Sequence, residues 1–430
     1  MSAAPAILEP RRKGASGVVQ SPGQAFEAWG SYDQEDPYPL FATVRARGAV
    51  HKVTLVDGHD AWLIARHEEA KALLNDPRLS KDLQAALASS PETVAEGLPG
   101  PDFARHMLVV DPPDHTRLRR LVSSAFSVHR IEALRPHVQS IIDDLLDGIA
   151  AQGSDARVDL VESFAFPLPF TVICELLGVP EPDRAPFGHA LGALLMPTPT
   201  PADFERAKVG SDAVVSMLTH LVETKQADPG DDLVTALINA RDGDERLDQR
   251  ELLSTILQLI IAGHDTTTSL IGNSVVALLR NPEQRAALQA NPDEIAPAVE
   301  ELLRYDSPVP HATFRYATEP VDIAGATIPV GAQVIIGLAS SNHDADEYAD
   351  PENLNLRRDD LHHLAFGHGI HFCLGAALAR MEGQLALRSL LVRFPQLRLA
   401  VSDNELHWGH GDGLVLRGLT ELPVIPGPAN

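Results

Sequence analysis

The chain has 430 residues, of which 44% are hydrophobic and 22% charged, and its 59 acidic and 35 basic side chains give a net charge of −24. This acidic balance disfavours nonspecific binding to nucleic acid and to anionic membranes. The hydrophobic share is ordinary for a globular enzyme with a large core. The only two cysteines, Cys174 and Cys373, lie far apart, so we expect no disulfide framework and a reducing cytoplasm.

The sequence predicts a tail at its start and no membrane-spanning segment. Residues 1–24 are rich in Ala, Pro, Gly and Ser and lack an apolar segment, so we expect a flexible tail there and a folded domain over residues 25–430. The best candidate for a membrane span, residues 252–279, contains Gln258, Asp265 and Asn273, which are too polar for lipid.

The first half of the chain begins with strands and continues with helices. Alternation around Gly58 predicts a hairpin over residues 50–64. A short helix is predicted over residues 67–74, and residues 80–106 have the composition of a loop. From Thr116 the pattern is mainly helical. Residues 247–280 form one long helical pattern that Asn281-Pro282 closes.

The second half alternates between helix and strand. Helices are predicted over 294–305 and 374–394, strands between 308 and 336 with turns at Gly325 and Gly331, and further strands within 397–401 and 414–424. The expected fold is therefore mainly α with small β-sheets.

The most informative segment is Phe366-Gly367-His368-Gly369-Ile370-His371-Phe372-Cys373-Leu374-Gly375. Free N–H groups and the helix dipole stabilise a thiolate at the start of a helix, and a thiolate ligand on haem iron favours O–O cleavage. In this interpretation Gly369 and Gly375 admit a flat macrocycle, because they lack a Cβ. Phe366 shields the sulfur from water, and His371 reaches a haem carboxylate.

Two other interpretations of this segment remain open at this point. A lone cysteine in a cytosolic chain is by default a buried structural residue. The cluster His362, His363, His368, His371 and Cys373 also suits zinc, although a structural zinc site usually has a second pair of ligands and none is visible.

The long helical pattern contains a polar centre, Ala262-Gly263-His264-Asp265-Thr266-Thr267. Gly and consecutive Thr weaken a helix, so this composition needs a structural reason. Thr266 can donate to the carbonyl of Ala262, four residues back, and open a groove for oxygen and water. Taken alone, the segment also fits a helix that passes a water channel.

Two further patterns are too common to indicate a function when each is taken alone. In Glu301-Leu302-Leu303-Arg304 the acid and the base share a helix face, which is commonly an exposed pair of little value. His115 and Arg119 are four residues apart and also share a face, which taken alone indicates a solvated helix.

The segment 366–375 resembles the haem-binding loop of cytochrome P450, whose pattern Phe-x-x-Gly-x-(Arg or His)-x-Cys-x-Gly it matches at every fixed position. The resemblance extends from about Asp36 to about Val424 and is strongest to soluble bacterial members, especially actinobacterial ones that oxidise polyketide-like natural products. It implies the single-domain P450 fold, with haem b as the cofactor and Cys373 as the iron ligand.

The resemblance also assigns roles to the other patterns. Asp265 and Thr266 become the acid–alcohol pair that delivers protons. Four donors for the two haem propionates follow, because Arg and His form charge-assisted bonds with carboxylates: His115, Arg119, Arg315 and His371.

Glu301 and Arg304 become a buried pair that a later arginine, Arg358, joins behind the haem. Relatives often carry Asp where this chain has Asn355, and Arg357 is adjacent, so the Arg358 assignment stays open.

Electrons must come from other proteins, because no Gly-rich nucleotide fingerprint is present. The implied donors are a ferredoxin and a ferredoxin reductase. A basic cluster predicts the docking patch for such an acidic partner, with a solvated face as the alternative: Arg117, Arg120, Arg130 and Arg135.

The resemblance places the substrate pocket between mostly apolar walls at 80–106, 196–201, 259–262, 309–313 and 414–416. The Pro-rich link 196–201 is either a lid hinge or an ordinary loop.

The function expected from the resemblance is a cytoplasmic, monomeric haem-thiolate monooxygenase with no nucleic-acid or membrane partner. It inserts one atom of O2 into an apolar organic molecule by hydroxylation or epoxidation, in natural-product biosynthesis or xenobiotic oxidation. The alternatives are a peroxide-driven peroxygenase, against which Asp265-Thr266 argue, and a non-catalytic haem sensor or carrier.

Overall fold

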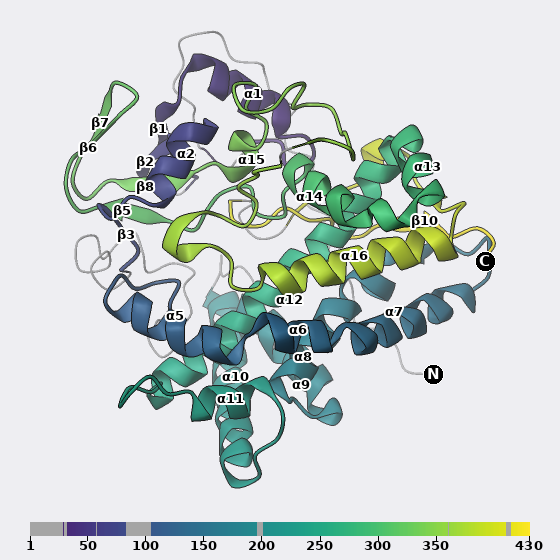
Figure 1. Ribbon diagram of the computed structural model, residues 1–430, viewed down its shortest axis with the longest axis horizontal. Coiled ribbons are helices and arrows are strands. Elements are labelled where there is room, and N and C mark those ends of the chain that lie inside the picture. Colours follow the sequence, from purple (N-terminus) through teal and green to yellow (C-terminus); the bar gives the residue numbers. More distant parts are fainter. Residues whose placement is uncertain are drawn as a thin grey trace.

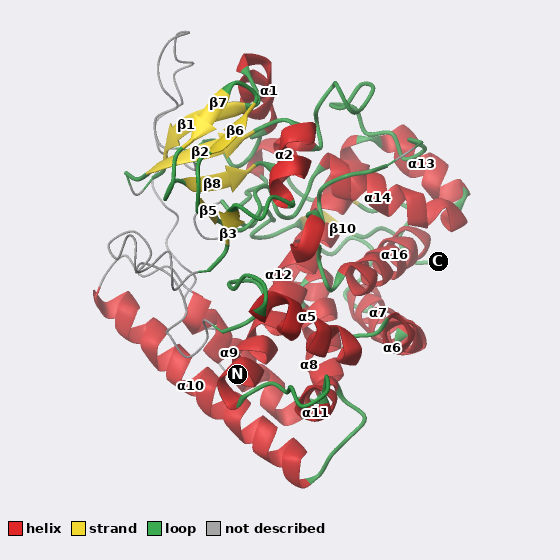
Figure 2. Ribbon diagram, turned by 60° about the vertical axis from the view of Figure 1, so that its left-hand side comes forward, coloured by secondary structure: helices red, strands yellow, loops and turns green. Residues whose placement is uncertain are grey.

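The computed structural model describes residues 29, 32–56, 58–82, 105–195, 201–359, 361–409 and 414–430. The expected tail 1–24, most of the loop 80–106 and most of the link 196–201 lie outside these residues. Helices fill most of the molecule and the larger sheet lies at one edge (Figure 2), so the predicted mainly α fold with small β-sheets is confirmed.

The α-helices of the described part are α1 (Tyr38–Arg47), α2 (His67–Leu74), α5 (Asp114–Ala125), α6 (Val128–Ala133), α7 (Arg135–Ala150), α8 (Pro167–Leu177), α9 (Glu181–Leu195), α10 (Pro201–Ala227), α11 (Leu233–Asn239), α12 (Gln249–Arg280), α13 (Pro282–Ala290), α14 (Ile295–Tyr305), α15 (Leu338–Ser341) and α16 (Ala376–Arg393). A π-helix at Val161–Ala165 precedes α8, and a 3₁₀ turn at Gly369–His371 precedes Cys373.

Helix α12 runs through the middle of the molecule (Figure 1) and packs against α8, α14 and α16. A capping box starts it: the Asp248 carboxylate accepts from the Glu251 N–H at 2.8 Å, and the Glu251 carboxylate accepts from the Asp248 N–H at 3.0 Å. The helix continues without interruption through its polar centre. It therefore presents that centre to the interior of the protein.

The larger sheet has the strand order β1 (Val50–Thr54), β2 (Asp60–Ile64), β8 (Gln333–Ile336), β5 (Arg315–Ala317) and β3 (Leu79–Ser80). Strands β2 and β8 pair in parallel, and the other neighbours pair antiparallel. The smaller sheets are β4 (Val158–Asp159), β10 (Pro423–Ile425) and β9 (Arg398–Leu399), and the hairpin β6 (Val321–Ile323) with β7 (Ala326–Ile328).

The strands predicted within residues 414–424 are confirmed in part: Leu419 forms an isolated bridge with Trp408, and Pro423 and Val424 begin β10. Arg417 enters the interior and donates to Asp306 at 2.8 Å, with 3% of the residue exposed. Leu414 packs with Trp29 and Phe41, away from the pocket to which we had assigned it.

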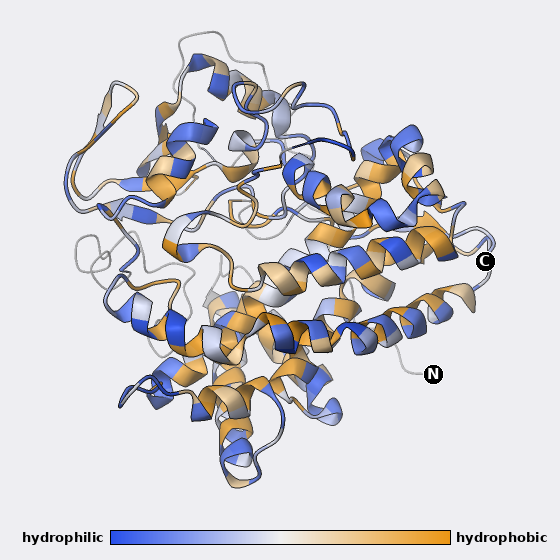
Figure 3. Cartoon of the chain, viewed as in Figure 1, coloured by the Kyte–Doolittle hydropathy of each residue, from blue (hydrophilic) through white to orange (hydrophobic). Residues whose placement is uncertain are grey.

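The main hydrophobic core lies among the helices, and smaller cores lie against the sheet. Figure 3 shows polar and apolar residues along both α7 and α16, as expected for helices that bury one side. Cys174 is fully buried in the main core, as its apolar neighbours predicted.

Among the described helices, no single one has the length and hydropathy to cross a membrane; the bent pair Val161–Leu177 and Glu181–Leu195 meets that test only jointly, by length and composition.

Candidate haem site

Cys373 lies in a tight loop between the 3₁₀ turn and α16. Its N–H donates to the carbonyl of Phe366 at 2.9 Å, which closes the loop. Gly367 and Gly369 have φ angles of 72° and 73°, which only glycine adopts readily. Gly369 owes its place to packing: a Cβ there would lie 2.7 Å from the Asn75 side chain, so our expectation that it admits the macrocycle was wrong.

The electrostatic environment of the Cys373 sulfur is mixed. Burial raises the pKa of the thiol, while backbone N–H groups of Gly375 and Ala376 and the cations of Arg119 and Arg380 act to lower this pKa. The start of α16 therefore favours the thiolate as predicted, but burial opposes it more strongly. A cation on the open side of the sulfur would supply the missing stabilisation.

The sulfur opens onto a cavity of about 250 Å³. Its predominantly apolar wall includes Leu74, Met107, Phe126, Ile173, Leu259, Ala262, Leu270, Val309, Ala312, Leu338, Phe366 and Leu378. The walls predicted at 259–262 and 309–313 are thus present.

The four predicted carboxylate donors gather at this cavity. The rings of His115 and His371 lie 4.3 Å apart, and both ring nitrogens of His115 are buried without a partner among the described residues. Arg119 donates to the carbonyl of Phe372 at 2.7 Å, and Arg315 donates to that of Thr313 at 3.0 Å.

Burial lowers the pKa of all four side chains, to about 2 for His371 and about 10 for Arg315. Four donors at one cavity, of which His115 and Arg315 are buried, fit the two carboxylates of a haem. The zinc alternative has no comparable support, because the described residues contain no group of three or more His, Cys, Asp or Glu side chains that could hold a metal ion.

The polar centre of α12 meets the cavity through Ala262, Gly263, Thr266 and Thr267, and Thr266 carries the predicted hydroxyl. That hydroxyl donates to the Ala262 carbonyl at 2.6 Å, which is the predicted bond. Asp265 does not line it. The Asp265 carboxylate instead lies 3.1 Å from Nδ1 of His264.

Sequence reasoning missed a carboxyl group at the cavity. Glu382 in α16 lines the cavity and is 1% exposed, and it forms a hydrogen bond with the Thr267 side chain. Burial raises its pKa to about 8. The available sequence signal was an acid at position 382 between Met381 and Gly383, which the structure shows to be buried. Helix periodicity alone does not show which face of a helix borders a cavity.

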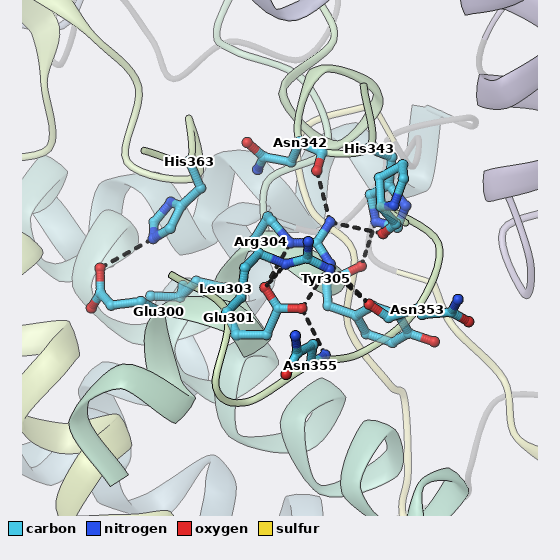
Figure 4. Close-up of polar contacts among 12 residues, drawn as sticks. Glu300, Glu301, Leu303, Arg304, Tyr305, Asn342, His343, Asn353, Asn355 and His363 are labelled. Carbon is cyan, nitrogen blue, oxygen red and sulfur yellow. Dashed lines mark hydrogen bonds and ion pairs between the residues drawn. The ribbon is translucent and has the colours of Figure 1, made fainter. Parts of the chain in front are cut away.

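Glu301 and Arg304 form the buried pair that the resemblance implied (Figure 4). Arg304 Nε lies 2.7 Å from Glu301 Oε2, Nη2 lies 2.8 Å from Oε1, and both residues are 0% exposed. Arg304 Nη1 also donates to the carbonyls of Asn342 and Pro351 at 2.8 and 2.9 Å. The pair thus joins α14 to the segment that leads to the cysteine loop.

The later arginine of this cluster is Arg358. Its Nε donates to Glu301 Oε2 at 3.1 Å, whereas Arg357 pairs with Glu294 at 3.0 Å. Asn355 contributes its backbone N–H to Glu301 at 2.9 Å, so its difference from Asp does not disturb this contact.

Each arginine of the predicted docking patch has an acidic partner in the structure. Arg117 pairs with Glu251 at the start of α12, and its side chain is only 19% exposed. Arg120 pairs with Asp242, Arg130 with Asp231 and Arg135 with Glu132. Arg117 therefore ties α5 to α12 and does not project toward a partner.

Comparison with known proteins agrees with this site. The model of the cytochrome P450 family matches residues 191–406. Cytochrome P450 107B1 of Saccharopolyspora erythraea is 44% identical over 397 residues, which are 91% of this chain and 96% of that protein. The cytochrome P450 monooxygenase PikC of Streptomyces venezuelae is 45% identical over 390 residues, 90% and 91% of the two chains.

Among solved structures, the ligand-free P450 monooxygenase TamI superposes with a TM-score of 0.83 at 41% identity, over 94% of this chain and 95% of its own. With a cysteine loop, a cavity and carboxylate donors that fit haem, the chain belongs to the cytochrome P450 family and is a haem-thiolate monooxygenase.

Proposed function

We propose that this enzyme uses haem b to insert one atom of O2 into a medium-sized or large apolar natural product, by hydroxylation or epoxidation. The observation that carries the proposal is that the Cys373 thiol and the Thr266 hydroxyl line one apolar cavity. A relative from Micromonospora griseorubida, 40% identical over 86% of this chain, is named mycinamicin IV hydroxylase/epoxidase. TamI has been solved with tirandamycin C bound.

In this proposal Cys373 would ligate the iron, and Phe366 and Gly375 would form the surface around the sulfur. His115, Arg119, Arg315 and His371 would hold the two carboxylates. When bound, the haem supplies the redox chemistry that activates O2.

Thr266 and Asp265 are the proposed proton-delivery pair. Reduction of O2 consumes protons, and an apolar cavity excludes the bulk water that would otherwise supply them. The Thr266 hydroxyl faces the cavity, and Asp265 is next to it in α12. We assign Asp265 the role of exchanging protons with the exterior, because its side chain is 22% exposed.

The substrate would lie against Met107, Leu259 and Val309. Gln258 also lines the cavity, and its Oε1 is buried without a partner within the described part of the chain. We propose that this oxygen accepts a hydrogen bond from a hydroxyl or amine of the substrate, because an unpaired buried acceptor is costly.

Electrons would come from NAD(P)H through a ferredoxin reductase and a ferredoxin. The enzyme would act as a monomer in the cytoplasm, where its two free cysteines stay reduced.

The test uses purified holoenzyme and a panel of macrolide and polyketide aglycones. Ligands that cause a low-to-high spin shift are then incubated either with ferredoxin, reductase and ¹⁸O-labelled O2, or with hydrogen peroxide alone. We expect a product carrying one ¹⁸O atom in the first assay. Product from peroxide alone would identify a peroxygenase, and spin shifts without product in either assay would identify a sensor or carrier.

A further inference from the structure

Lys81 is a buried cation at the haem cavity to which no motif pointed. It follows strand β3, and its position is set by the pairing of β3 with β5, in which Ser80 lies opposite Tyr316 (Figure 1). Continuing that antiparallel register by one residue sets Lys81 opposite Arg315. The residue is 5% exposed and lines the cavity.

The ammonium of Lys81 has no carboxylate partner among the residues that the structure describes. It donates to the hydroxyl of Thr313, whose carbonyl accepts from Arg315 at 3.0 Å. Two cations therefore converge on one residue at the cavity wall. Burial and the neighbouring Arg315 lower the pKa of Lys81 well below its usual range.

The nearest acid, Asp111, is already engaged. Its Oδ1 accepts from the backbone N–H of Lys81 at 2.9 Å, and its Oδ2 accepts from the Ser80 hydroxyl. When protonated, Lys81, Arg119 and Arg315 bring three positive charges to the cavity lining, and Asp111 beside Lys81 brings one negative charge. Two further negative charges would make the group neutral.

A buried, unpaired ammonium beside an unpaired guanidinium is costly unless an anion neutralises them. The group that occupies a P450 cavity carries two carboxylates, which is the charge that this wall lacks. The electrostatic influence of Lys81 also reaches His371 and His115, two of the predicted carboxylate donors. Lys81 therefore lies within the same group of side chains.

We propose that Lys81 is a further haem-binding residue, whose ammonium pairs with one haem propionate next to Arg315. The proposal depends on the haem site of the family and not on the identity of the substrate, so the two can fail independently.

The test compares holoenzyme carrying Lys81→Met, Lys81→Arg or Lys225→Met. Lys225 is the control, because it is a largely buried lysine that has its own partner, Asp232, at 2.8 Å and is not among the cavity-lining residues. Haem release is followed as transfer to excess apomyoglobin. We expect release from the Lys81→Met enzyme to be roughly tenfold faster or more, as for loss of a charge-assisted hydrogen bond, and release from the Lys81→Arg enzyme to be close to wild type.

A second readout separates pairing with a propionate from general destabilisation. The propionate bending bands in the resonance Raman spectrum should shift in Lys81→Met and stay unchanged in Lys225→Met, even if both variants unfold at lower denaturant. Unchanged bands and unchanged release in Lys81→Met would overturn the proposal. If that variant instead lost only the spin shift caused by lauric acid, Lys81 would bind an acidic substrate, and the proposal would be wrong.

Discussion

Glu300 and Arg380 form a two-point ion pair, with Nε 2.8 Å from Oε1 and Nη2 2.8 Å from Oε2. This pair joins α14 to α16 seven residues after Cys373, and the Arg380 guanidinium lies 4.5 Å from the centre of the Phe366 ring. Hydrogen bonds from His363 and Arg380 outweigh burial and lower the pKa of Glu300 to about 2. The carboxylate therefore remains charged and keeps Arg380 beside the cysteine loop.

We predict that Arg380→Met makes the reduction potential of the haem more negative, because it removes a positive charge near the sulfur. It should also destabilise the fold by roughly 1–2 kcal/mol, since the pair is only partly buried. Spectroelectrochemistry and denaturant unfolding measure the two effects. Arg388→Met is the control on the same helix, because Arg388 pairs with Asp293 at 2.9 Å on the surface; an equal change in potential there would refute the explanation.

Cys373→Ser should abolish the red-shifted Soret band of the ferrous carbon monoxide complex, because the thiolate ligand is lost. The matched control is Cys174→Ala: the Cys174 thiol is fully buried, and burial raises its pKa to about 12, so it is inert. This control should keep the band and lose about 1 kcal/mol of stability. A normal band in the Cys373 variant would show that another residue ligates the iron.

The parts of this site that sequence reasoning found are encoded by local patterns or, like the four carboxylate donors, were implied by the resemblance. The cysteine loop, the bond from Thr266 to Ala262 and the pair Glu301–Arg304 each lie within ten residues of chain. The end of α12 at Arg280 followed from the stop signal Asn281-Pro282.

The parts that were missed depend on contacts between distant segments. Lys81 and Thr313 are 232 residues apart, and Glu300 and Arg380 are 80 apart, so no spacing rule relates them. The pairing of Arg117 with Glu251 of another helix was missed for the same reason.

Arg117→Glu should therefore act on stability. It leaves the largely buried carboxylate of Glu251 without its cation and adds a second negative charge, so we expect a loss of about 2–4 kcal/mol. Arg120→Glu is the comparison, because the Arg120 side chain is 59% exposed and its loss should cost about 0–1 kcal/mol. Denaturant unfolding monitored at the Soret band provides both values. Similar stability of the two variants, with slower ferredoxin-supported reduction in Arg117→Glu, would restore the docking interpretation.

Glu382 gives the folded protein a pH dependence of known sign. Its pKa is raised to about 8, from an ordinary value of 4.5. Burial penalises only the charged form of Glu382. The stabilisation of the folded protein by neutral Glu382 is therefore complete below pH 4.5, the pKa in the unfolded chain, and is lost as the pH rises through about 8, the pKa in the folded protein. The wild type should thus lose stability relative to Glu382→Gln by on the order of 1 kcal/mol per pH unit between about pH 5 and 8.

The measurement is the denaturant midpoint of both proteins across this range, expressed as a difference so that other groups cancel. Glu300→Gln is the control, because the pKa of Glu300 is about 2 and it adds no slope in this window. A flat difference between wild type and Glu382→Gln would mean that Glu382 is charged in the folded enzyme.

Thr266 provides the sharpest test of proton delivery. Thr266→Ala removes the hydroxyl of a cavity-lining residue, which within the described part of the chain donates only to the Ala262 carbonyl of its own helix, so haem and substrate binding should persist. Reductant should still be consumed, but hydrogen peroxide should replace much of the product, because positioned proton transfer is typically worth about 10²–10⁴-fold. Thr268→Ala is the matched control: this hydroxyl donates to the His264 carbonyl at 3.1 Å, and Thr268 is not among the cavity-lining residues.

Asp265→Asn should slow product and peroxide formation together, because it removes the acid next to Thr266 in the helix. If Thr266→Ala and Thr268→Ala turned over with the same coupling, the protons would have to arrive by a path that avoids Thr266.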